Sequence, residues 1–262
     1  MGGTLVPLGG ASAQGASCTY DPATHTVWIQ TPPDEFEQSN LILLGEEIRF
    51  SDDPCEGATV TNTDSINVTG IPGQEAFIIQ GEFTPGLSPE PEGQPEIEIS
   101  VNLGPGYNIL ALVGTDGDDQ LTLGALGIAV NSDGDLDIAV QPEVSSILIH
   151  SELGSDRVSA RGGNGSVGPS QARLELVTGE GRDRILDGLG HDVLVAGKGR
   201  DVVTGGVGKD LVRGGDGNDR LMGGKGRDAL RGGHGVDWCR PRPGKDFTAK
   251  CERPAPLFGD GD

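Results

Sequence analysis

A nine-residue period over residues 178–240 constrains this chain more than any other feature of its sequence. Seven copies follow one another without an insertion, and each has an aspartate, two glycines and an apolar residue at fixed positions. The aspartates are Asp183, Asp192, Asp201, Asp210, Asp219, Asp228 and Asp237. Glycine stands two residues before each aspartate, at Gly181, Gly190, Gly199, Gly208, Gly217, Gly226 and Gly235. It also stands four residues before each, at Gly179, Gly188, Gly197, Gly206, Gly215, Gly224 and Gly233. The apolar residue follows each aspartate by two, at Ile185, Leu194, Val203, Val212, Leu221, Leu230 and Cys239.

The spacing within one copy predicts a six-residue turn followed by a three-residue strand. Glycine permits positive φ and has no Cβ, so the carbonyl oxygens of such a turn can converge on one point. A hard cation such as Ca²⁺ takes six to eight oxygen ligands, and the aspartate adds an anionic oxygen. The middle residue of the strand points inward and its neighbours point outward, which accounts for one apolar position per copy. We therefore expect calcium sites at the turns and a thin apolar core.

The last four copies also begin with glycine, as in Gly214-Gly215-Asp216-Gly217-Asn218-Asp219. This segment resembles the haemolysin-type, or RTX, calcium-binding repeat family of secreted bacterial proteins. The resemblance implies that two nonapeptides form one coil of a β-roll and that calcium ions sit between turns eighteen residues apart. Alternate aspartates would then line opposite edges of the roll. A disordered glycine-rich linker would not keep aspartate and aliphatic residues in place through seven periods.

Degenerate copies extend this interpretation upstream. Residues 114–122 fit the nonapeptide with one substitution, so Asp119 is a further candidate calcium ligand. Asp137 and Asp156 lie in weaker copies and are expected to be solvated turn residues. Short alternating segments predict strands at 63–69, 75–83, 97–103, 108–113, 146–150 and 172–177, with residues 84–96 as a loop. The predicted fold class is all-β, a right-handed parallel β-solenoid or β-roll with a small N-terminal β cap.

Five segments are expected along the chain. Residues 1–17 resemble a truncated secretion leader with a cleavage-like Ala11-Ser12-Ala13, so that the mature chain begins near Gln14. Residues 18–58 form the N-terminal cap, with strands at 24–30, 41–44 and 47–50 and Trp28 as a buried anchor. Residues 59–177 form irregular coils and 178–240 the regular roll. Residues 241–262 form a disulfide-closed C-terminal cap and a tail that is disordered from residue 253.

The four cysteines are interpreted as two disulfides, Cys18–Cys55 and Cys239–Cys251, although four cysteines allow three connectivities. Disulfides indicate an oxidising compartment, so we expect a secreted, extracellular protein exported by the general pathway. No stretch approaches eighteen apolar residues, and no membrane span is expected.

The charge of the chain is unevenly distributed. Its formal net charge is −21, with 26 acidic and 4 basic residues in 1–177 but 10 acidic and 11 basic residues in 178–240. Arg200, Lys209 and Arg227 directly precede aspartates, and the ninth position holds Arg213, Arg231 and Arg240. We expect these residues to weaken calcium affinity. Acidity alone would indicate solvation or cation binding, and we expect no nucleic-acid partner.

The residues point to a calcium-binding protein that is not an enzyme. The four histidines, His25, His150, His191 and His234, are scattered and none begins a zinc-protease motif. We expect a monomeric structural or adhesive module whose partners are calcium and an anionic cell-wall polymer or polysaccharide. One alternative is a calcium-independent solenoid in which the arginines replace the cations. Another is a calcium-dependent polysaccharide lyase or epimerase that uses Arg157, Arg161 and Arg173 near Asp156.

Overall fold

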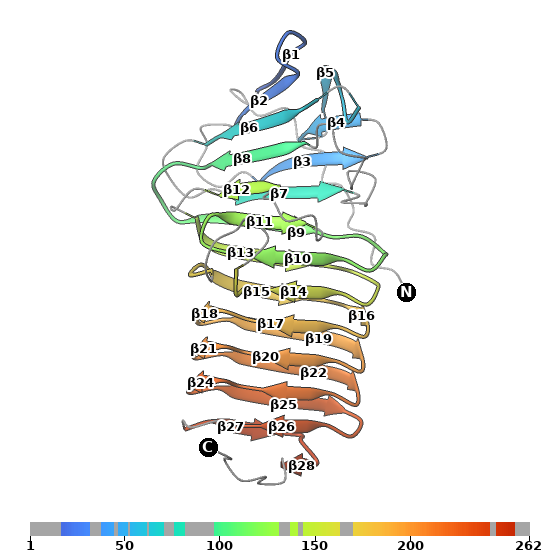
Figure 1. Ribbon diagram of the computed structural model, residues 1–262, viewed down its shortest axis with the longest axis vertical. Coiled ribbons are helices and arrows are strands. Elements are labelled where there is room, and N and C mark those ends of the chain that lie inside the picture. Colours follow the sequence, from blue (N-terminus) through green and yellow to red (C-terminus); the bar gives the residue numbers. More distant parts are fainter. Residues whose placement is uncertain are drawn as a thin grey trace.

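The computed structural model describes residues 17–31, 38–44, 47–51, 53–61, 63–70, 76–81, 97–130, 137–140, 144–162, 170–241 and 245–254. Every regular element in these ranges is a β-strand, and none is a helix. The prediction of an all-β protein is confirmed. Most strands belong to a thirteen-stranded and a twelve-stranded sheet, and Figure 1 shows their strands stacked along the long axis of the molecule.

The repeats place their strands alternately in the two sheets. The thirteen-stranded sheet holds β17 (Arg184–Leu186), β20 (Val202–Thr204), β23 (Arg220–Met222) and β26 (Trp238–Arg240). The twelve-stranded sheet holds β15 (Arg173–Val177), β19 (Val193–Gly199), β22 (Leu211–Gly217) and β25 (Ala229–His234). Neighbours pair in parallel with a register of eighteen residues, as in Arg184 with Val202 and Val193 with Leu211. Two nonapeptides therefore make one coil, as predicted.

Short two-residue strands continue the pairing through the turns. At one edge β18 (Leu189–Gly190), β21 (Val207–Gly208) and β24 (Lys225–Gly226) form a three-stranded ribbon. β16 (Glu180–Gly181) pairs with the end of β19 at the other edge. The turns are thus hydrogen-bonded from coil to coil, in addition to the strands.

The predicted apolar position of each repeat lies in the core. Ile185, Val203 and Leu221 of one sheet and Leu194 and Val212 of the other are 0% exposed, and Leu230 and Cys239 are 1% exposed. Each coil therefore buries only two such side chains. Burial of a Val or Leu side chain contributes about 1.5–3 kcal/mol, which is little for eighteen ordered residues. A coil of this kind needs stabilisation from outside its apolar core.

Upstream of the repeats, most strands still pair in parallel with a strand of the next coil, but more residues of the sequence separate the paired strands. One sheet holds β6 (Ser65–Thr69), β8 (Glu98–Asn102), β10 (Gln120–Leu123), β11 (Gly127–Val130), β12 (Ile138–Val140) and β14 (Arg157–Ser159). The other holds β7 (Ala76–Gly81), β9 (Asn108–Val113) and β13 (Val144–His150). The strands predicted upstream of residue 177 are confirmed. The antiparallel excursion through β10, β11 and β12 was not predicted.

The N-terminal end combines antiparallel and parallel pairing. β1 (Ser17–Asp21) and β2 (Thr26–Gln30) are antiparallel, as are β3 (Gln38–Leu44), β4 (Glu47–Phe50) and β5 (Asp53–Thr59). β2 and β3 then pair in parallel with β6 and β7. The prediction that Trp28 is buried is wrong: its side chain is 53% exposed, because strand alternation turns Val27 and Ile29 into the core.

Both predicted disulfides are present. Cys18 of β1 is bonded to Cys55 of β5, and Cys239 of β26 to Cys251. Beyond the last repeat, β27 (Phe247–Ala249) and β28 (Arg253–Pro254) add one strand to each sheet. The described residues include no helix able to cross a membrane. The prediction that the tail is disordered from residue 253 is wrong for its first two residues, because β28 pairs in parallel with β26 there. The predicted leader before Ser17, the loop at 84–96 and the rest of the tail after Pro254 lie outside the described residues. The boundaries of the five segments stay predictions.

Candidate metal centre

Hydrogen bonds join the repeat aspartates of successive coils into two columns. In the first column the backbone N–H of Asp183, Asp201 and Asp219 donates to Oδ1 of the aspartate eighteen residues later, at 2.9 to 3.0 Å. In the second column Asp192 and Asp210 donate in the same way, at 3.2 and 3.1 Å. One oxygen of each accepting carboxylate is therefore held against the preceding coil.

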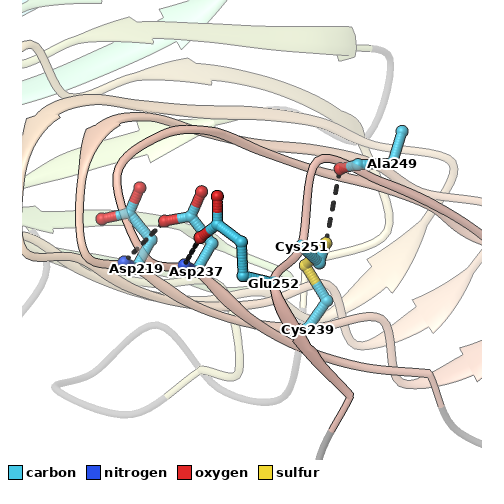
Figure 2. The surroundings of a disulfide bond; sticks show 6 residues. All are labelled: Asp219, Asp237, Cys239, Ala249, Cys251 and Glu252. Atoms are coloured by element: carbon cyan, nitrogen blue, oxygen red, sulfur yellow. Dashed lines mark hydrogen bonds between the residues drawn. A yellow bond between two sulfur atoms is a disulfide. The ribbon is translucent and has the colours of Figure 1, made fainter.

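Both columns extend beyond the seven repeats. At the N-terminal end of the first column, Asp119 N–H donates to Asp156 Oδ1 and Asp156 N–H donates to Asp183 Oδ1, both at 3.0 Å. At its C-terminal end, Asp237 N–H donates to Glu252 Oε2 at 3.1 Å (Figure 2). The second column ends on Asp246, whose Oδ1 accepts from Asp228 N–H at 3.0 Å.

The other carboxylate oxygen is buried and has no hydrogen-bond partner. This holds for Oδ2 of Asp183, Asp192, Asp201, Asp210, Asp219, Asp228, Asp237 and Asp246. The seven repeat aspartates are at most 2% exposed. An unpartnered carboxylate oxygen away from water is costly, and the group responds by binding a proton or a cation.

The proton affinity of these carboxylates reflects their burial. Burial, the largest cause, and the charges of neighbouring aspartates in the same column together raise the pKa of Asp201 and of Asp210 to about 7. Burial also raises the pKa of Asp219, Asp228 and Asp237. Each column is thus a row of closely spaced acids, none of which forms an ion pair within the described residues.

Glycine at the first position of the last four repeats leaves no side chain beside the unpartnered oxygens. A Cβ at Gly214 would lie 2.4 Å from Asp219 Oδ2, and the same distance separates Gly223 from Asp228 Oδ2 and Gly232 from Asp237 Oδ2. A side chain at these positions would therefore fill the cradle. Carboxylate oxygens beside such a space fit Ca²⁺, which takes oxygen ligands in flexible geometry. The repeat aspartates, with turn carbonyl oxygens, are the residues that would hold it.

Turns upstream of the repeats are closed by side chains instead. Ser151 Oγ donates to Asp156 Oδ2 at 2.6 Å. Thr115 donates its N–H to Asp119 Oδ2 at 3.0 Å and its hydroxyl to Asp119 Oδ1 at 3.1 Å. Asp119 therefore lies at the head of the first column with both oxygens partnered, and its predicted role as a calcium ligand stays a prediction.

Two weaker predictions have different outcomes. Asp156 was expected to be solvated, but it is 0% exposed and belongs to the first column, and burial raises its pKa to about 6. Asp137 lies outside both columns, and its Oδ2 accepts the Val130 N–H at 2.7 Å. Asp246 was not proposed as a site residue, although it follows Asp237 by nine residues and continues the period.

The basic residues of the repeats do not neutralise the columns. Arg200, Lys209 and Arg227 are exposed, and no side chain donates to the unpartnered aspartate oxygens within the described residues. The basic residues considered as part of an enzyme site, Arg157, Arg161 and Arg173, do not share one sheet face. Arg157 is exposed on β14 of the thirteen-stranded sheet, whereas Arg173 is exposed on β15 of the other sheet.

Comparison with known proteins places this geometry in a family. Residues 177–212 and 213–247 match the model of the RTX calcium-binding nonapeptide repeat, a unit of four copies. No curated protein and no solved structure matches the chain. The matched residues contain both columns from Asp183 to Asp246. Residues 177–247 therefore form an array of the RTX calcium-binding nonapeptide repeat family.

Proposed function

We propose that the protein is a secreted calcium-binding module whose repeats fold as a right-handed β-roll when Ca²⁺ is bound. The observation that carries this proposal is the row of buried, unpartnered Oδ2 atoms beside glycine cradles. Bound calcium would supply the countercharge and the oxygen coordination that the columns lack. The repeat aspartates hold their other oxygen against the preceding coil. Glycine at the first position of the last four repeats keeps the space beside Oδ2 free of a side chain, whereas Thr178, Asp187 and Ala196 occupy that position in the first three.

Folding of the array is coupled to the metal in this proposal. Each coil has a thin apolar core, and without a cation its aspartates must stay protonated or repel one another along the column. Binding energy therefore becomes folding energy. The two disulfides support an extracellular location, and bacterial secretion agrees with what is typical of the repeat family.

A calcium titration of the full-length, disulfide-bonded protein at neutral pH tests the proposal. We expect far-UV circular dichroism to show a cooperative gain of β signal as Ca²⁺ is added and its loss when a chelator is added. Magnesium should be a poor substitute, because it demands near-ideal octahedral geometry and gives up its water reluctantly. A spectrum that responds to neither calcium nor chelator would favour the calcium-independent solenoid instead. We propose no catalytic activity.

A second proposal concerns adhesion through the outer face of the thirteen-stranded sheet. Cross-strand pairing places Arg157, Arg184, Val202, Arg220 and Trp238 in one row along the axis of the stack. The outward positions of β14, β17, β20, β23 and β26 include no acidic residue. Strands lie about 4.8 Å apart, so Arg184 and Arg220 present guanidinium groups roughly 10 Å apart. Such a row suits the regularly spaced anionic groups of an acidic polysaccharide or cell-wall polymer.

Arg184→Ala combined with Arg220→Ala should weaken binding to an immobilised acidic polysaccharide about tenfold, since each exposed charge contact is worth up to about 1 kcal/mol. The matched control is Arg213→Ala with Arg231→Ala, which removes the same charge from the outer face of the other sheet. Binding should also weaken as salt is raised. Equal losses for both double variants would contradict a specific face and leave only net charge as the cause.

A further inference from the structure

One turn of the array departs from the glycine pattern in a way that adds a carboxylate. The first position of the repeat is glycine in the last four copies, but the second copy has Asp187 there. Asp187 is 2% exposed, and its backbone N–H donates to the Thr204 carbonyl at 2.9 Å. Its Oδ1 accepts the Gly188 N–H at 2.7 Å, and its Oδ2 is buried without a partner.

The Asp187 carboxylate lies at the first step of the second column. Asp187, Asp192 and Asp210 each offer an oxygen, and these three oxygens lie within 4.8 Å of one another. Calcium–oxygen distances are about 2.3–2.6 Å, so one ion can contact oxygens up to about 5 Å apart. All three residues are at most 2% exposed, and each has an Oδ2 without a hydrogen-bond partner. A single cation can therefore contact all three oxygens.

The surroundings provide access and a balancing charge. Asp187 lines an open pocket together with Arg161, Thr204, Met222 and Lys225. Arg161 is held there because its Nε donates to the Asp187 carbonyl oxygen at 3.2 Å. Three carboxylates exceed the charge of one divalent ion by one, and the Arg161 guanidinium, held on the backbone of Asp187, brings one positive charge to this turn. The other steps of the second column, such as Asp210 with Asp228, have glycine at the first position and so lack the third carboxylate.

We propose that Asp187, Asp192 and Asp210 form a three-carboxylate calcium centre that binds Ca²⁺ more tightly than the two-carboxylate steps and fills first. The proposal rests on the calcium-binding function proposed above and assigns Asp187 a role that the repeat pattern gives to no residue. Calcium affinity in proteins rises with the number of charged ligands. The first ion to bind therefore orders the turns at 187–192 and 205–210. The coils that follow in the sequence then fold against these ordered turns.

Calcium binding to the full-length protein, measured by equilibrium dialysis and isothermal titration calorimetry, tests this centre. The wild-type isotherm should contain one site that is at least about tenfold tighter than the rest. Asp187→Asn, which keeps the side-chain volume, and Asp187→Gly, which restores the repeat pattern, should both abolish that site and leave the others. Ala196→Gly is the matched control, since it restores glycine in the next copy without removing a carboxylate. It should leave the tight site unchanged.

The outcomes separate this proposal from the one on which it rests. If Asp187→Gly binds calcium as tightly as the wild type, or more tightly, Asp187 only replaces a glycine and the proposal is overturned. If the wild-type protein binds no calcium at all, the proposed function fails and this centre fails with it. Circular dichroism at saturating calcium should show that both Asp187 variants are folded, so that loss of the tight site is a local effect.

Discussion

Without calcium, the repeat array should be folded near pH 4 and should unfold as the pH is raised through about 7. The pKa of Asp156 is raised to about 6, and those of Asp201 and Asp210 to about 7, because burial disfavours their charged forms. An unfolded aspartate has a pKa near 3.9. Between these values the folded chain binds more protons than the unfolded chain, so its stability falls as the pH rises.

The expected effect is large. A pKa about three units above the unfolded value corresponds to roughly 4 kcal/mol for each of Asp201 and Asp210, and a whole domain has only about 5–15 kcal/mol. The sign is opposite to that of a salt-bridged aspartate, which is stabilising at neutral pH and loses its contribution in acid. Calcium should remove the dependence between pH 5 and 8 by occupying the space beside the ionised oxygens.

Urea unfolding from pH 4 to 8, with a chelator and with calcium, measures this dependence. Asp201→Asn together with Asp210→Asn is the matched control, because an amide mimics the protonated acid in size and lack of charge. The metal-free double variant should stay folded to a higher pH than the wild type. A metal-free protein that is least stable in acid would contradict the role assigned to the buried carboxylates.

Gly217→Ala should unfold the coils that follow Gly217 in the sequence, even at saturating calcium. The φ of Gly217 is 145°, and a Cβ there would lie 1.5 Å from the Gly199 carbonyl oxygen of the coil above. No side-chain rotation relieves a contact between Cβ and backbone, so the turns must separate. We expect a loss of about 3–5 kcal/mol in the free energy of unfolding, at the upper end of single substitutions. Thermal unfolding with calcium present measures it.

Gly214→Ala, three residues earlier in the same turn, is the matched control. Its methyl group would lie 2.4 Å from Asp219 Oδ2, a side-chain atom that can shift, and 2.8 Å from the Gly232 carbonyl oxygen, a much milder backbone contact than the 1.5 Å at position 217; no positive φ is required. Alanine already occupies this position at Ala196 and is buried in the core there. This variant should therefore fold but bind calcium more weakly at one step. If both substitutions cost the same, close stacking of the turns does not explain the glycine at position 217.

The period of the repeats predicted the turns, the strands and the apolar core from sequence. The resemblance to the RTX repeat family implied the coil of two nonapeptides and the alternation of aspartates between two edges. The nine-residue spacing continues from Asp237 to Asp246, so Asp246 at the end of the second column could also have been predicted from the sequence. Glu252 was not, because it lies fifteen residues after Asp237 and reaches its N–H with a longer side chain.

Upstream of residue 178 the nine-residue period is lost, so the members of the aspartate columns could not be predicted there. Asp156 joins Asp183 across 27 residues and Asp119 across 37, so no fixed spacing revealed its place in the column. Trp28 lies between two apolar residues, and only the strand geometry decides which of the three faces out. The sequence also could not show which carboxylate oxygens at the turns lack a hydrogen-bond partner, because this depends on hydrogen bonds between coils.

The hydrogen bonds of the columns all run in one direction along the chain. Each donor N–H belongs to an earlier residue, and each accepting carboxylate belongs to a residue at least fifteen positions later. A ribosome makes the earlier residue first, so every donor emerges before its acceptor. The last acceptors, Asp246 and Glu252, emerge after all the repeats. The array therefore cannot complete its columns until Asp246 and Glu252 have been synthesised, so the coil that closes the stack is the last to form.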